Sequence, residues 1–443
     1  MSLLGCGHGR RAVIIVVGRA APCTRVDGGD SVTGDNVDTG ATPRGEPDEA
    51  PRFVSNADKL GYSPPLDGMR GLGVMLVVFV HASFVAFASF AATVDMFFVV
   101  SGFLITTLLL EEDRRSGRVN LKRFYGRRAL RLLPLMYLVL VATLLAFLVL
   151  HLLFDERELL DRAISDVIAG GTYTYHVIHP VHHELVGGGP APIRPLIQLW
   201  SLTVEEHFYL FGVLIILFVV RRRWITPLMV AFVAAWVAIG IARVGGAVGP
   251  NFAWYQRPDA LLLGVVLAFV NARLPNTWSP RTDVWMRRAT TAAVLICAAV
   301  VFVGTALAKP FGIYIPFLVP EGGSLHDGLY WGEFGFTLVS GCVGIMVLTF
   351  VRCPDHWAAR ALSWKPFRVV GVRSYAIYLI HVPLGVLMME TIGRKSPALF
   401  VLLYVPALAA TSELAHRLVE KPAMRIKLKM AEPGASGTSV RGV

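Results

Sequence analysis

The segment Leu132–Leu150 reads LLPLMYLVLVATLLAFLVL and contains no charged residue. Wound as a helix, it is apolar on every face, and such a helix suits lipid as its surroundings. Leu210–Val220 has the same character. Neither run alternates apolar and polar residues, which excludes the strands of an outer-membrane barrel. These runs therefore predict membrane-spanning helices.

The composition of the whole chain agrees with a membrane protein. Of the 443 residues, 54% are hydrophobic and 16% are charged, whereas soluble chains carry about a quarter charged residues. This balance excludes a soluble enzyme, a fibrous chain and a disulfide-stapled secreted domain. The five cysteines show neither a disulfide framework nor metal-ligand spacing. We expect no metal and no bound cofactor.

Ten apolar runs are candidates for membrane-spanning helices. They lie near 69–90, 94–111, 131–153, 196–220, 225–245, 256–272, 289–307, 329–351, 368–390 and 398–418. An eleventh candidate, 161–178, carries three charged residues and a glycine pair, so it is expected to be interfacial or re-entrant. The prediction is an all-α, polytopic membrane protein.

Lysine and arginine orient the predicted helices. The net charge of +11 is concentrated in short segments between the apolar runs, which follows the positive-inside rule and argues against a nucleic-acid partner. Residues 111–131 hold eight basic residues, and Arg221, Arg222 and Arg223 follow a later run. Both segments are expected in the cytoplasm, with two crossings between them. Continued along the chain, this topology places both termini in the cytoplasm and the protein in the inner (plasma) membrane.

The two ends of the chain differ from the middle. Residues 1–62 are rich in Gly, Asp, Thr and Pro, which predicts a disordered tail. The membrane domain is expected over 63–425. Residues 426–443 should form a second disordered tail, because so few residues cannot bury a core.

Ionisable groups inside a bilayer are costly, so each is a functional hypothesis. Arg70 and His81 are eleven residues apart in the first predicted helix. In an α-helix they return to within about 20° of one face, separated by roughly 16 Å. The helix therefore places a cation at the inner interface and an imidazole deep in the membrane on the same face. The alternatives are a topology anchor for Arg70 and a structural, hydrogen-bonded histidine for His81.

The segment from Leu199 to Tyr209 places two adjacent carboxylates, Glu205 and Glu206, beside His207 in a predicted membrane helix. Consecutive helical residues point about 100° apart, so at most one carboxylate readily faces a given partner. By depth, both His81 and Glu205 should lie near the middle of the membrane, where they could meet. The alternative is a structural polar contact between helices.

Other polar groups are weaker candidates when each is taken alone. Ser101 and Gly102 form a small pair that is typical of close helix packing. Tyr378 and His381 lie one turn apart, and for them we favour hydrogen bonds between helices. Arg257-Pro258-Asp259 suggests an ion pair at the outer interface. The histidine-rich segment 176–184 is interpreted as a loop and not as a metal site.

In their order along the chain, these elements resemble the acyltransferase-3 family of integral-membrane O-acyltransferases. The resemblance covers about 65–425 and departs from the family at His207, where glutamine is usual. Its motifs are Arg70 with His81, Phe97-Phe98-x-x-Ser101-Gly102-Phe103, Arg128-x-x-Arg131, Trp200-Ser201-Leu202-x-Val204-Glu205-Glu206-x-Phe208-Tyr209, Arg257-Pro258-Asp259-Ala260-x-x-x-Gly264, Tyr375…Tyr378-Leu379-x-His381 and Glu420-Lys421-Pro422.

The resemblance implies transfer of an acyl group, commonly acetyl, from cytoplasmic acyl-coenzyme A as co-substrate. The acceptor would be a hydroxyl of a cell-surface glycan, a glycolipid or a glycosylated metabolite. In the family the histidine that matches His81 is the catalytic candidate, and the arginine that matches Arg70 is linked to the donor. Supporting roles are expected for Ser101, Trp200, Ser201, Tyr209, Arg257, Asp259, Tyr378 and His381.

The chemistry of the residues agrees with this implication. A hydroxyl is a poor nucleophile until a positioned base takes its proton, and a neutral imidazole at His81 suits that task. Glu205 or Glu206 could orient the ring and stabilise the imidazolium. Arg70, Arg128 and Arg131 could bind the phosphates of coenzyme A, although positive-inside anchoring explains the last two equally well.

Two other classes of function compete with an enzyme. A secondary transporter or flippase also uses buried Arg, His and Glu for ion coupling, but the sequence shows no inverted repeat with matching broken helices. A lipid-binding or sensory membrane protein would explain the cytoplasmic arginines. It would leave Glu205 and Glu206 without a purpose.

Overall fold

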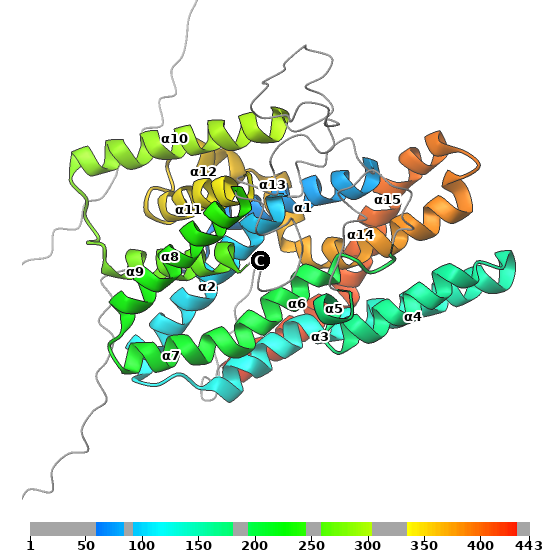
Figure 1. Ribbon diagram of the computed structural model, residues 1–443, viewed down its shortest axis with the longest axis horizontal. Helices are drawn as coiled ribbons and strands as arrows, with labels where there is room; N and C mark the ends of the chain where they lie inside the picture. The colour runs from blue at the N-terminus through cyan, green and yellow to red at the C-terminus, as the bar shows by residue number, and fades with distance from the viewer. Residues whose placement is uncertain (1–58, 84–91, 180–193, 245–257, 304–334, 432–443) are drawn as a thin grey trace, which may run out of the picture. The chain divides into compact units, whose positions relative to one another are not determined.

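The computed structural model describes residues 59–83, 92–179, 194–244, 258–303 and 335–431 (Figure 1). All of them belong to one compact unit, residues 50–443. Most of the two expected tails, 1–62 and 426–443, lies outside the described residues. Within the described residues the chain is helical and contains no strand.

The helices follow the apolar runs of the sequence. In chain order they are α1 (Pro64–Ser83), α2 (Thr93–Ser116), α3 (Leu121–Phe154), α4 (Arg157–Gly171), α5 (Tyr175–Ile178), α6 (Leu199–His207), the π-helical turn η3 (Phe208–Gly212), α7 (Val213–Arg221), α8 (Ile225–Val244), α9 (Asp259–Arg273), α10 (Pro280–Val303), α11 (Phe336–Arg352), α12 (Trp357–Leu362), α13 (Lys365–Val372), α14 (Ser374–Met388), η7 (Met389–Gly393), α15 (Pro397–Ala415), η8 (His416–Glu420) and α16 (Lys421–Ala431).

Six of the described helices are long and apolar enough to cross a membrane. They are Thr93–Ser116, Leu121–Phe154, Leu199–Arg221, Ile225–Arg243, Ser374–Gly393 and Pro397–Ile426, and the shorter Phe336–Arg352 is also apolar. The chain is thus a helical, multi-pass membrane protein. Ten crossings with both termini in the cytoplasm remain a prediction.

Two expected runs differ in detail from the helices that form. The run 368–390 is divided at Arg373, which ends α13 and pairs with Glu413 of α15. The run 161–178 becomes α4 and the single turn α5. Neither α4 nor α5 is among the helices long and apolar enough to span.

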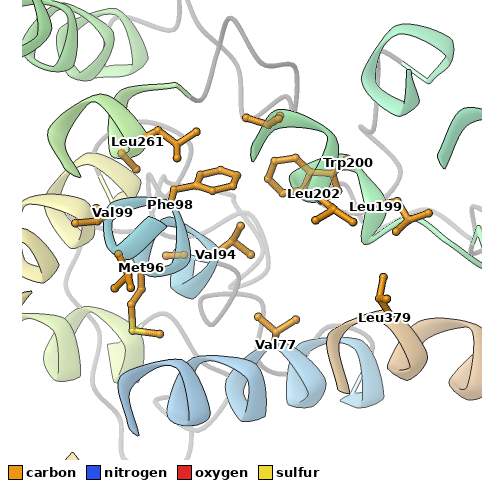
Figure 2. Close-up of a cluster of buried hydrophobic side chains, with 14 of the residues drawn as sticks. Val77, Val94, Met96, Phe98, Val99, Leu199, Trp200, Leu202, Leu261 and Leu379 are labelled. Atoms are coloured by element: carbon orange, nitrogen blue, oxygen red, sulfur yellow. The ribbon is translucent and has the colours of Figure 1, made fainter. Parts of the chain in front are cut away.

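A buried hydrophobic cluster joins α1, α2, α6, α9 and α14 around the site residues (Figure 2). Trp200 of α6 packs edge-on against Phe98 of α2, with 6.1 Å between the ring centroids. Val77 of α1 and Leu379 of α14 belong to the same cluster. Dense packing of this kind fixes the rotation of each helix about its axis, and so the direction of its polar side chains.

The small pair Ser101-Gly102 does mark close helix packing, as its composition predicts. A Cβ atom on Gly102 would lie 2.3 Å from the carbonyl oxygen of Leu261 in α9. The backbones of α2 and α9 therefore touch. A closer contact fixes α1, because a Cβ on Gly71 would lie 2.0 Å from the carbonyl oxygen of Phe367 in α13.

Replacing Gly71 by alanine is expected to lower the free energy of unfolding by about 1–3 kcal/mol, because the added methyl group meets backbone and forces α1 away from α13. The measurement is denaturant unfolding in detergent micelles. Gly171→Ala is the matched control, since its Cβ would lie 3.6 Å from Leu140, an ordinary contact. Equal stability of the two variants would contradict the close approach.

Candidate active site

His81 lies near the end of α1 and faces a second imidazole. Its Nδ1 is 3.0 Å from the carbonyl oxygen of Val77, one turn earlier in the same helix. The ring meets His381 of α14 edge-on, with 4.9 Å between centroids and 74° between planes. His81 is half-buried, whereas His381 has no exposed surface.

The structure does not pair His81 with either glutamate, which corrects the interpretation from the sequence. Glu205 accepts hydrogen bonds from Ser101 of α2 and from the hydroxyl of Tyr209, the latter at 2.5 Å. Glu206 binds Arg128. Similar depth in the membrane suggests that the two side chains meet, but depth does not determine which way each helix is rotated.

Arg128 is held by Glu206 and Tyr209. Its Nε donates to both oxygens of Glu206 at 2.9 and 3.1 Å, and its Nη2 donates at 2.5 Å. The guanidinium carbon lies 3.1 Å from the centroid of the Tyr209 ring, a cation–π contact. Tyr209 lies in the π-helical turn η3, a geometry that is frequent at functional sites. This network links α2, α3 and α6.

The three arginines expected to bind the donor do lie near one another. The charge of Arg131 interacts unfavourably with those of Arg70 and Arg128. Arg131 is exposed, and among the described residues it forms no hydrogen bond or ion pair. Within the described part of the chain, the one ion pair of Arg70 is with Asp67, at 4.0 Å. Such a set of cations is best stabilised by an anion, and phosphate groups suit arginine.

Ser201 and Tyr378 connect α6 to α14. Their hydroxyl oxygens are 2.5 Å apart, and Tyr378 also donates to the carbonyl oxygen of Gln198 at 2.9 Å. The side chain of Gln198 donates in turn to the carbonyl oxygen of Leu379 at 2.9 Å. Tyr378 thus forms the helix-to-helix hydrogen bonds expected of it. Gln198, which the sequence analysis did not single out, completes the connection that positions His381.

Asp259 forms a buried ion pair between α8 and α9, whereas the two histidines belong to α1 and α14. Its oxygens accept from Arg243 of α8 at 2.7 and 2.9 Å, and both side chains are 2% exposed. Arg243 also donates to Thr337 of α11 at 2.8 Å. The sequence suggested an ion pair at the outer interface for this region; Asp259 does form an ion pair, with Arg243, and its position at the interface remains a prediction. Arg257 lies outside the described residues.

The histidine-rich segment is described only as far as His179. In that described part, no three His, Cys, Asp or Glu side chains come together as metal ligands would. His176 packs edge-on against His207, with 4.9 Å between the ring centroids, and burial lowers the pKa of His176 to about 4. His182, His183 and Glu184 lie outside the described residues.

The fold and these polar contacts define a helical, multi-pass membrane protein that contains an imidazole pair and a cluster of arginines. A family model for the acyltransferase domain of the acyltransferase-3 family matches residues 65–412. The match covers more than half of the chain, so the chain belongs to this family. The resemblance carried by its motifs is confirmed.

Several curated relatives are peptidoglycan O-acetyltransferases by name. The chain is 30% identical over 377 residues to peptidoglycan O-acetyltransferase OatA of Listeria monocytogenes. It is 28% identical over 370 residues to O-acetyltransferase OatA of Staphylococcus aureus. It is 30% identical over 379 residues to the putative peptidoglycan O-acetyltransferase YrhL of Bacillus subtilis. Each match covers 82% of this chain but only 55–57% of the relative. No solved structure matches the chain.

Proposed function

We propose that the protein is a membrane O-acyltransferase that moves an acetyl group from cytoplasmic acetyl-coenzyme A to a hydroxyl of a cell-surface glycan. The names of the relatives favour a peptidoglycan sugar as the acceptor. One observation carries the proposal: an accessible imidazole inside a membrane protein of this family has one ring nitrogen available as a base.

The tautomer of His81 follows from its hydrogen bond. A carbonyl oxygen can only accept, so Nδ1 carries the proton that is shared with Val77. Nε2 is left with a free lone pair. In the reaction Nε2 takes the proton of the acceptor hydroxyl as its oxygen attacks the thioester carbonyl. The carbon–sulfur bond then breaks, and the imidazolium returns the proton to the thiolate of coenzyme A.

The arginine cluster supports the donor side of the proposal. Among the residues that the structure describes, no carboxylate lies within hydrogen-bonding distance of the guanidinium groups of Arg70 and Arg131. The diphosphate of coenzyme A would supply the missing negative charge. Arg128 is fixed by Glu206, which already balances its charge, so the unbalanced charge comes from Arg70 and Arg131.

Replacing Arg131 by alanine is expected to raise the KM for acetyl-coenzyme A roughly 10- to 100-fold, the value of one or two charge-assisted hydrogen bonds. The kcat should stay near that of the parent, because binding to a remote phosphate is the same in the ground and transition states. The measurement is a donor titration in detergent. Lys122→Ala removes an exposed cation from the same helix and should change neither constant. An unchanged KM for Arg131→Ala would contradict the donor site.

The activity itself is tested with oriented vesicles. Inverted vesicles from cells that express the full chain receive radiolabelled acetyl-coenzyme A, and label bound to envelope glycan as an alkali-labile ester is counted. We expect label in inverted vesicles, and little in right-side-out vesicles or vesicles without the protein. Uptake of a solute coupled to protons, without ester formation, would overturn the proposal.

A further inference from the structure

His381 and His81 use their ring nitrogens in the same way. Nδ1 of His381 lies 2.7 Å from the carbonyl oxygen of Tyr378, one turn earlier in α14. Since that oxygen can only accept, Nδ1 of His381 carries the proton. Nε2 is therefore a hydrogen-bond acceptor in both rings, and two acceptors cannot bond to each other.

The free nitrogen of His381 is costly as it stands. Its Nε2 is buried and has no hydrogen-bond partner among the described residues. A buried acceptor without a donor is unfavourable, because it has lost its hydrogen bond to water and gained none in the protein. The neighbouring ring is that of His81, with 4.9 Å between the ring centroids. A proton on Nε2 of His81 would give the acceptor on His381 a donor.

We propose that His381 is the positioning partner of His81 and accepts a hydrogen bond from the imidazolium that forms during acyl transfer. The inference rests on the proposed function. The acceptor O–H bond breaks, the new Nε2–H bond of His81 forms, and this N–H donates to Nε2 of His381 until the proton passes to the departing thiolate. No exposed surface is left on His381, so it acts through His81 and not on the substrates.

The surrounding helices hold His381 in place for this task. Tyr404 of α15 donates to the carbonyl oxygen of His381 at 2.8 Å. Tyr378 is fixed to Ser201 and Gln198 of the α6 segment. The backbone around His381 is thus fixed by two neighbouring helices and its ring by the carbonyl oxygen of Tyr378, so the one unsatisfied nitrogen is preorganised to meet a charge that exists only during the reaction.

The test compares His381→Leu with His381→Gln in the acetyl-transfer assay. Leucine removes the acceptor, and we expect kcat to fall roughly 10- to 100-fold, as for a lost hydrogen bond to a charged group. The KM values of both substrates should stay within about twofold, because the bond exists only beyond the ground state. Glutamine offers an amide oxygen as acceptor, and most of kcat should return.

Controls separate this role from packing. Tyr137→Phe loses a hydrogen bond to the carbonyl oxygen of Gly171 but keeps both imidazoles and the groups that hold them, and its kcat should equal that of the parent. Each variant is accepted only with a parent-like melting curve. If His381→Leu matches the parent in kcat, or if glutamine is as slow as leucine, the inference is overturned. A fully active His81→Ala would instead overturn the proposed function beneath it.

Discussion

Replacing His81 by alanine is expected to lower the rate of acetyl transfer by about 10²–10⁴-fold, the usual contribution of a positioned general base. Alanine leaves no group near the attacking hydroxyl that can take its proton. The loss should appear in kcat, since the imidazole does not touch the phosphates of the donor. Single-turnover transfer of labelled acetyl from coenzyme A measures it directly.

A second histidine variant controls for nonspecific effects. His151 also lies in a membrane helix, where its ring approaches Asp155 at 3.8 Å. His151→Ala should transfer acetyl at the parental rate. Parental activity in a folded His81→Ala protein would remove the base from the proposed mechanism. Lost activity in both variants would show that the effect is general and not chemical.

Replacing Asp259 by alanine is expected to destabilise the protein by about 3–5 kcal/mol, because it leaves Arg243 buried without its counter-charge. Arg243 is 2% exposed and cannot reach water without moving α8. The measurement is unfolding in mixed micelles by a rising fraction of denaturing detergent.

The exposed pair Arg157–Asp161 provides the matched control. Its nitrogen–oxygen distance is 3.9 Å and its side chains are 80% and 66% exposed. Asp161→Ala should change the free energy of unfolding by less than about 1 kcal/mol, as for other surface pairs. A double variant with leucine at both 243 and 259 should recover much of the lost stability, because it removes the unpaired charge. If Asp259→Ala and Asp161→Ala are equally stable, the buried pair does not have the importance assigned to it.

The sequence predicted the helices well because solid apolar runs leave few alternatives. It also predicted the contact of Gly102 and the gathering of Arg70, Arg128 and Arg131, which follow from small side chains and from charge at one end of several helices. These features depend on where residues lie along a helix, and composition and spacing give that position directly.

The partner of His81 could not be predicted in the same way. The sequence places Glu205 and His81 at similar depth in the membrane, but contact also requires that each helix is rotated so that the two side chains face one another. The packing of Trp200 on Phe98 sets that rotation, and it turns Glu205 toward Ser101 instead. The imidazole of His381 takes the place beside His81 that was expected for a carboxylate.

Arg243 and Gln198 were both missed from the sequence, but the sequence indicates the role of one more clearly than that of the other. Arg243 lies inside the apolar run 225–245, and a charge at that depth is itself a reason to expect a partner. It could have been found and assigned to Asp259. Gln198 gave no such indication, because its role depends on the backbone of α14, which no local pattern describes.

The contact between Gly71 and α13 has a consequence for the interpretation of variation among related chains. A position that admits only glycine because two backbones touch will be as invariant as a catalytic histidine, although it performs no chemistry. Saturation mutagenesis scored by survival would assign Gly71 and His81 the same intolerance. Only separate readouts of protein abundance and turnover would distinguish the residue that builds the scaffold from the residue that handles the proton.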